Sequence, residues 1–183
     1  RATPQWFISM KKNSLRENAL KAINQTDFFP SIGKNRIKGM IETRPDWCIS
    51  RQRFWGVPLP IFLNKHTDEP LINDQVFEKI YDIFLDEGSD AWYTKSVSEI
   101  LPEKFDFNEF KKVEDIVEVW FDSGSTHSYV LEKRKDLKWP ADMYLEGSDQ
   151  HRGWFHSSLL HSCGTRNQAP YKSILTHGFV VDG

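Results

Sequence analysis

The sequence lacks long apolar runs and has very few cysteines. No stretch of about 18 apolar residues occurs, so we expect no membrane span. The two cysteines, Cys48 and Cys163, form no C-x-x-C pair, and their spacing suggests neither a zinc site nor a disulfide framework. No signal peptide is visible. Two free thiols suit the reducing cytosol, so we expect a cytoplasmic protein without a bound metal ion.

The sequence also lacks a strong excess of either charge. Its formal net charge is -2, so the chain as a whole is not a basic nucleic-acid binder, although a local basic face remains possible. Hydrophobic residues make up 39% and charged residues 27%, the composition of an ordinary folded domain. A length of 183 residues is enough for one domain with a core, or for one domain with a small insertion.

The chain opens on Arg1 without a methionine and stops at Gly183, just as an apolar run finishes. We expect it to be a piece of a longer protein, and such a piece can carry half of a site.

Strand-like and helical segments alternate along most of the sequence, which predicts an α/β fold with a mostly parallel sheet. Ser14-x-x-Glu17 has the form of a capping box and would begin the first helix. Residues 122–126 are expected to be a loop that could begin another helix. We expect strands at 6–10, 47–49, 116–121, 143–145 and from 173, and helices at 15–23, 37–41 and 153–160.

Residues 64–112 are more polar than their surroundings and contain one clear amphipathic helix, which Gly88 would end. Just before them, the proline-containing segment 56–63 must be an edge strand or an extended connector, because proline cannot donate a ladder hydrogen bond. We therefore expect an inserted subdomain at 64–112, between the two parts of a larger domain at 1–63 and 113–183.

The most informative stretch runs from Asp142 to Trp154. A strand-like run ends in Glu146 and Gly147, and a polar turn and a helix follow. Ligands of open α/β sheets bind at the carboxyl ends of strands. Asp149 could accept hydrogen bonds from ribose hydroxyls, and Trp154 could form the wall of an apolar pocket. The alternative is that Asp149 caps a helix and Trp154 belongs to the core.

Three further segments offer candidate residues. One expected strand ends in Trp120 and Phe121 and is followed by Asp122-Ser-Gly124, so these residues could lie at the mouth of the sheet, or they could be core residues and a plain turn. His177-Gly178 also follows an expected strand. Arg51 and Arg53 alternate with aromatic residues and could bind the end of a nucleic-acid strand, or form a solvated pair beside core aromatics. The histidines at 151, 156 and 161 lack metal-ligand spacing and are expected to be surface or structural residues.

Taken together, these motifs resemble the isoleucyl-tRNA synthetases of bacterial type, which are class I aminoacyl-tRNA synthetases. The resemblance covers nearly the whole chain in the family's order, and only residues 64–112 are poorly diagnostic. The matching segments are Ala2-Thr-Pro-Gln-Trp-Phe7, Arg44-Pro-Asp-Trp-Cys-Ile-Ser-Arg-Gln-Arg-Phe-Trp-Gly56, Val119-Trp-Phe-Asp-Ser-Gly-Ser-Thr-His127, Asp142 to Trp154 and Leu175-Thr-His-Gly-Phe179.

The resemblance implies the C-terminal half of a class I Rossmann-like catalytic domain with an inserted connective subdomain. It implies an enzyme that uses ATP and Mg²⁺ to convert isoleucine to isoleucyl-adenylate and then passes the acyl group to tRNA(Ile). By position, the isoleucine side-chain pocket would contain Trp120, Gln150 and Trp154. The residues that would hold the aminoacyl-adenylate are Glu146, Gly147, Asp149, Gln150, His177 and Gly178.

The chain also departs from the family pattern. Glu118 stands where many relatives have Asp, and neither the His-Ile-Gly-His-type nor the Lys-Met-Ser-Lys-Ser-type signature occurs. The resemblance therefore assigns no catalytic residue to this chain, and we expect the chain alone not to activate isoleucine. The alternative is a stand-alone binding module that uses its tryptophans for carbohydrate, or Arg51 and Arg53 for tRNA.

Overall fold

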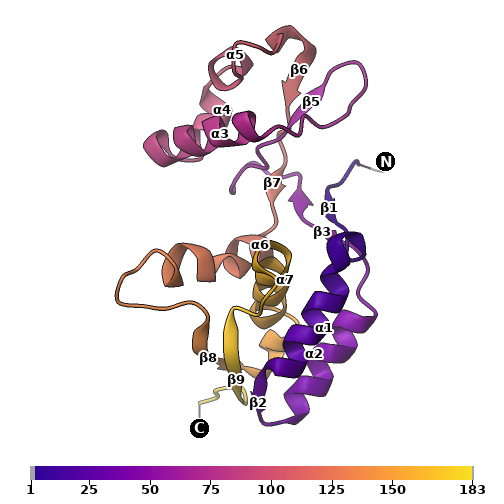
Figure 1. Ribbon diagram of the computed structural model, residues 1–183, viewed down its shortest axis with the longest axis vertical. Coiled ribbons are helices and arrows are strands. Elements are labelled where there is room, and N and C mark those ends of the chain that lie inside the picture. The colour runs from indigo at the N-terminus through magenta and orange to yellow at the C-terminus, as the bar shows by residue number, and fades with distance from the viewer. Residues whose placement is uncertain (1–2, 183) are drawn as a thin grey trace. The chain divides into compact units, whose positions relative to one another are not determined.

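The computed structural model describes residues 3–182 and divides into two compact units (Figure 1). The first unit comprises Arg1–Ile49 and Glu118–Gly183, and the second comprises Ser50–Val117. The expected insertion at 64–112 lies inside the second unit, which begins earlier and ends later. The expectations for Arg1, Ala2 and Gly183 lie outside the described residues.

The first unit contains the two longest strands and the helices that pack against them. In chain order, its elements are β1 (Phe7–Ile8), η1 (Lys12–Ser14), α1 (Leu15–Gln25), β2 (Asp27–Phe29), α2 (Ile32–Glu42), β3 (Trp47–Cys48), α6 (Val119–Gly124), η3 (His127–Leu131), β8 (Ala141–Gly147), η4 (Ser148–His151), α7 (Trp154–Arg166) and β9 (Tyr171–His177).

The sheet of the first unit has the strand order β2-β9-β8, and both of its pairings are parallel. This confirms the expected α/β fold with a parallel sheet. Two features were not expected: the short strand β2 joins this sheet, and the predicted strands near residues 7 and 47 instead pair with each other as antiparallel β1 and β3. Strands of two residues carry too little periodicity to reveal their partner.

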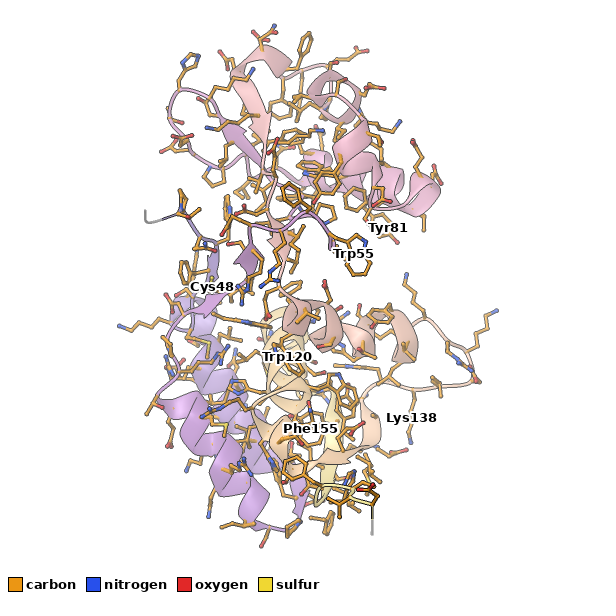
Figure 2. The ribbon with its side chains drawn as sticks, turned by 180° about the vertical axis from the view of Figure 1, so that it is seen from behind. Cys48, Trp55, Tyr81, Trp120, Lys138 and Phe155 are labelled. Carbon is orange, nitrogen blue, oxygen red and sulfur yellow. The ribbon has the colours of Figure 1, made fainter. Side chains whose placement is uncertain are left out.

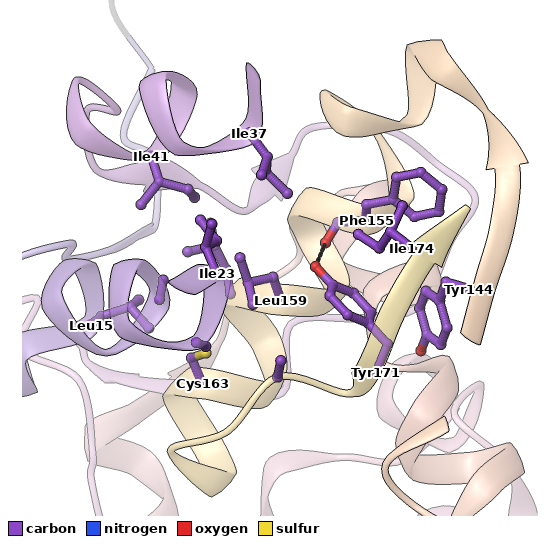
Figure 3. Packing of buried hydrophobic residues seen from close by; sticks show 14 of the residues in the cluster. Leu15, Ile23, Ile37, Ile41, Tyr144, Phe155, Leu159, Cys163, Tyr171 and Ile174 are labelled. Atoms are coloured by element: carbon purple, nitrogen blue, oxygen red, sulfur yellow. Dashed lines mark hydrogen bonds between the residues drawn. The ribbon is translucent and has the colours of Figure 1, made fainter. Parts of the chain in front are cut away.

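Helices α1 and α2 lie side by side (Figure 1), and their apolar faces meet α7 and the sheet in one core. Leu15, Ala19 and Ile23 follow the helical repeat of α1 and are buried, as the sequence predicts. Figure 3 shows the centre of this core, where the hydroxyl of Tyr171 donates a hydrogen bond of 3.0 Å to the backbone carbonyl of Phe155. The buried hydroxyl thus has the partner that its burial requires.

The prediction of 116–121 as a strand is wrong, and in the segment 122–126, expected to be a loop that could begin a helix, residues 122–124 are helical and belong to a helix that begins earlier. Only Ile116–Val117 is a strand, and Val119–Gly124 forms helix α6. The physical reason is Glu118, whose carboxylate accepts a hydrogen bond of 3.0 Å from the backbone N–H of Trp120 and so begins the helix. A run of apolar and aromatic residues does not distinguish a buried strand from a short helix.

The predicted capping box at Ser14 is also wrong. Ser14 adopts a left-handed backbone conformation, with φ of 54°, and its side chain forms no capping hydrogen bond. Asn13 has the same φ, so the chain enters α1 through a kinked 3₁₀ turn rather than through a capped start. Helix α1 itself lies where the apolar spacing predicts it, because that spacing reflects burial rather than the cap.

The second unit has its own smaller core, in which the rings of Phe62 and Trp92 lie 4.9 Å apart. In the segment 56–63, residues 56–61 are extended, and Phe62 and Leu63 belong to a strand of a two-stranded sheet, so each of the two predicted alternatives holds in part. The elements are β4 (Ser50–Arg51), β5 (Phe62–Asn64), α3 (Asp74–Glu87), α4 (Ala91–Thr94), α5 (Val97–Ile100), η2 (Phe107–Glu109), β6 (Phe110–Lys112) and β7 (Ile116–Val117).

Helix α3 confirms the amphipathic pattern of the second unit. It buries Val76 and Ile80, and it ends at Gly88, whose φ of 82° suits glycine. Strands β4 and β7 pair antiparallel, as do β5 and β6. Helix α3 has 14 residues, and within residues 3–182 no helix is long and apolar enough to cross a membrane.

Candidate functional site

The parallel pairing of β8 and β9 brings two of the predicted segments together. In this register Glu146 lies opposite Thr176, and Gly147 lies opposite His177. Both strands end here, so their last residues share the carboxyl edge of the sheet, where open α/β sheets bind ligands. Residues that are about thirty positions apart in sequence thereby become neighbours.

The turn after β8 places a carboxylate over this edge. A Cβ atom at Gly147 would lie 2.5 Å from Oδ1 of Asp149 and 3.9 Å from Cε1 of His177, so both side chains border the position that glycine leaves empty. The side-chain amide of Gln150 donates a hydrogen bond of 2.9 Å to Oδ2 of Asp149. The glycine, the carboxylate, the amide and the imidazole thus form one polar cluster.

Trp120 joins the cluster from a different element. It lies on α6, and 43% of its surface is exposed (Figure 2). A Cβ atom at Gly153 would lie 2.9 Å from Cη2 of Trp120 and 2.5 Å from Oε1 of Gln150. The lack of a side chain at Gly153 therefore allows the indole and the amide to approach each other beside the start of α7.

Trp154 is held in place on two sides. Its ring stacks on that of Tyr144, with centroids 4.0 Å apart and an angle of 5° between the planes. Its indole N–H donates a hydrogen bond of 3.0 Å to the carbonyl of Ser123, and its backbone N–H donates one of 3.0 Å to Oε1 of Gln150. The ring is only half-buried, so it belongs partly to the core and still presents some of its surface.

His177 and Gly178 are exposed at the end of β9. Nδ1 of His177 lies 2.6 Å from the backbone carbonyl of Gly178. A carbonyl can only accept, so this contact requires the proton on Nδ1 and leaves Nε2 as an acceptor in the neutral ring. The imidazole can therefore accept a hydrogen bond from a ligand at this edge.

Sequence reasoning missed the residues that hold these groups. The carboxylate of Glu118 accepts a hydrogen bond from the indole N–H of Trp47 at 2.9 Å, in addition to capping α6, and it is buried. Tyr144 and Ser123 support Trp154. An acidic residue directly before a helix was the available signal for Glu118, but the strand prediction for this segment concealed it.

Asp122 lies next to these groups on α6, and its acidity is altered. Burial, together with the negative charge of Glu118, raises the pKa of Asp122 to about 6. Its carboxyl group therefore changes its charge close to neutral pH. No group of three or more His, Cys, Asp or Glu side chains among residues 3–182 is placed to hold a metal ion.

Arg51 and Arg53 belong to the second unit. Arg51 is half-buried, and its guanidinium donates a hydrogen bond of 2.7 Å to the carbonyl of Ser50. The expectation that the neighbouring aromatics belong to a core is wrong, because Phe54 and Trp55 are almost fully exposed. Both residues lie outside regular helices and strands, just before the proline-containing connector, and their side chains are exposed to solvent.

Buried histidines support the first unit from within. His127 and His161 form a hydrogen bond of 3.0 Å between Nε2 and Nδ1, and burial lowers the pKa of each to about 4. Burial and the charge of Arg44 lower the pKa of His156 to about 3. Of the two predicted roles, surface or structural, His151 and His156 have the structural one, because both are buried.

Comparison with known proteins gives the same family as the resemblance in the sequence motifs. The family of class I tRNA synthetases (I, L, M and V) matches residues 1–183. An isoleucine–tRNA ligase of Pelagibacter ubique is 66% identical, and one of Caldanaerobacter subterraneus is 56% identical. Each alignment covers 100% of this chain and 20% of the relative. The chain thus spans about a fifth of the length of the curated relatives it matches.

From the lowered pKa values of these histidines we predict that acid destabilises the first unit. In the unfolded chain a histidine binds a proton below about pH 6.5, whereas folded His127, His161 and His156 resist protonation down to about pH 4 or 3. The free energy of unfolding should therefore fall between pH 6.5 and pH 4, with a slope of up to about 1.4 kcal/mol per pH unit for each such histidine.

Urea denaturation at a series of pH values measures this slope. The variant His156→Gln, which cannot titrate at this position, should show a shallower fall than the parent chain. A free energy of unfolding that stays constant from pH 7 to pH 4 would contradict the assignment of neutral buried rings.

Proposed function

This chain belongs to the class I tRNA synthetase family, and we propose that it forms one wall of the aminoacyl-adenylate site of an isoleucine–tRNA ligase. The protein that carries it joins isoleucine to ATP, which gives isoleucyl-adenylate and pyrophosphate, and then transfers the isoleucyl group to tRNA(Ile). One observation carries the proposal: segments far apart in sequence, each part of the family resemblance, converge at the carboxyl edge of β8 and β9.

Under this proposal the first unit is the C-terminal half of a Rossmann-like catalytic domain. The parallel sheet, with helices between its strands, is the architecture that such a domain requires. The second unit, Ser50–Val117, is the inserted connective subdomain. This boundary is wider than the sequence predicted, since the proline-containing connector and both β4 and β7 belong to the insertion.

The adenylate lies at the polar cluster. Glu146 and Asp149 carry the carboxylates that accept hydrogen bonds from ribose hydroxyls, and both are exposed at the strand ends. Gly147 allows the backbone to approach the ligand closely. His177, which is paired with Gly147 in the register, and Gly178, which follows it, approach the adenine. Because Nδ1 of His177 donates to the carbonyl of Gly178, Nε2 is left as the nitrogen that can accept a hydrogen bond from the adenine amino group.

The isoleucine side chain lies against the indoles. Trp120 supplies an exposed apolar face, and Trp154 supplies a half-buried one that Tyr144 and Ser123 hold in place. Gln150 links the two halves of the site, because its amide contacts Asp149 and the backbone of Trp154. A branched aliphatic group gains free energy when it leaves water for such a surface.

The reaction at the phosphates of ATP depends on groups outside these segments. We assign no catalytic residue to this chain, and Mg²⁺ enters as the counter-ion of the substrate ATP rather than as a resident metal. The alternative of a stand-alone carbohydrate-binding or tRNA-binding module gains no support from the relatives, which carry this segment within isoleucine–tRNA ligases.

The variant Trp154→Ala in the full-length enzyme should weaken the binding of isoleucine more than that of ATP. Loss of one apolar wall should raise the apparent dissociation constant of isoleucine about tenfold. The control Trp154→Phe keeps a ring to stack on Tyr144 and should lose less. Equal losses for isoleucine and ATP, measured by isoleucine-dependent pyrophosphate exchange, would remove Trp154 from the side-chain pocket.

The 183-residue chain on its own should not catalyse isoleucine-dependent pyrophosphate exchange, because neither phosphate-binding signature of the family occurs in its sequence. Circular dichroism of the same sample must show the helices described above, so that inactivity is not a result of unfolding. Exchange well above the background rate from this chain would refute the assignment of the catalytic groups to other segments.

A further inference from the structure

A hollow lies in the first unit, between α2 with the residues that follow it and the start of α7. It has a volume of about 430 Å³. Arg36, Gly39 and Met40 line it from α2 at helical spacing, so they share one face of that helix, and Thr43 lines it from the position just after the helix. His156 lines it from the first turn of α7, and Arg152 lines it from the turn just before that helix.

This hollow is separate from the aminoacyl-adenylate site. In a helix, positions two apart point about 200° away from each other, so His156 and Trp154 lie on opposite sides of α7. The candidate adenylate residues at Glu146, Gly147 and Asp149 do not line the hollow. It is therefore a separate candidate site.

The charge of the hollow is strongly positive. Arg36, Arg44 and Arg152 all line it, and no acidic residue does. Within residues 3–182 none of these three arginines forms an ion pair with a carboxylate. The guanidinium of Arg44 lies 5.7 Å from the centroid of the Trp47 ring, which holds it in place. Three guanidiniums close together repel one another unless an anion joins them.

One buried group of the hollow also lacks a hydrogen-bond partner among the described residues, because Nε of Arg44 is buried and unpaired. His156 is only 3% exposed, and a hydrogen bond with the backbone of His151 raises the pKa of its ring against the larger effect of burial. An unpaired buried donor is costly, and a ligand that accepts hydrogen bonds removes this cost.

We propose that this hollow binds a phosphate group. Arg36, Arg44 and Arg152 neutralise its charge, and their guanidinium N–H groups donate hydrogen bonds to its oxygens. Guanidinium groups match the geometry of phosphate oxygens and can bind them in pairs. Arg36 and Arg152 are exposed and can reach a group at the mouth, whereas Arg44 and His156 form the deeper part.

Met40 provides a probe, because it also lines the hollow. The full-length protein, labelled with [¹³C]methyl-methionine, is titrated with sodium phosphate at pH 7 and constant ionic strength, and the variant Met40→Leu identifies the signal. A second titration uses a single-stranded oligouridylate, whose phosphates are diesters. A shift of the Met40 signal that saturates with phosphate alone indicates a free phosphate ligand, and one that saturates with the oligonucleotide indicates an RNA backbone.

The variant Arg152→Gln should raise the dissociation constant of whichever ligand binds by about tenfold, because it removes one charged hydrogen-bond donor at the surface. The control is Arg134→Gln, which removes another exposed positive charge, one that pairs with Asp136 and does not line the hollow, and it should leave the dissociation constant unchanged. The variant Arg152→Lys should recover part of the affinity. No saturation in either titration, or equal effects of the Arg152 and Arg134 substitutions, would overturn the proposal.

Discussion

The parallel ladder between β8 and β9 is the interaction on which the rest of the site depends. Its register sets Gly147 beside His177, and the shared carboxyl edge then receives Asp149 from the turn and the start of α7. A register shift of one residue would turn each side chain to the other face of the sheet. The core fixes this register, because Tyr144 and Ile174 are buried opposite each other.

A second constraint acts through one buried carboxylate. Glu118 caps α6 and accepts a hydrogen bond from Trp47, so the start of α6 is tied to the segment that precedes the insertion. Helix α6 in turn places the indole of Trp120 beside Gly153. The carbonyl of Ser123, on the same helix, accepts a hydrogen bond from the indole N–H of Trp154. The aromatic part of the candidate site thus rests on a charged group that contacts no proposed ligand.

Much of this arrangement could be predicted from the sequence. The apolar spacing of α1 and α3 reflects burial, so both helices lie where it predicts them. The residues at 146–150 and 177–178 lie at the ends of their strands because a polar turn must follow an apolar run. Helix α6 and the antiparallel pair β1–β3 could not be predicted, since their formation depends on Glu118 and on long-range partners that no local pattern reveals.

A crystal structure of the full-length protein with a non-hydrolysable isoleucyl-adenylate analogue tests the central claim most directly. The account predicts that the ribose hydroxyls lie within hydrogen-bond distance of Glu146 or Asp149, and that the isoleucine side chain contacts Trp120. An analogue bound away from the carboxyl ends of β8 and β9 would contradict it.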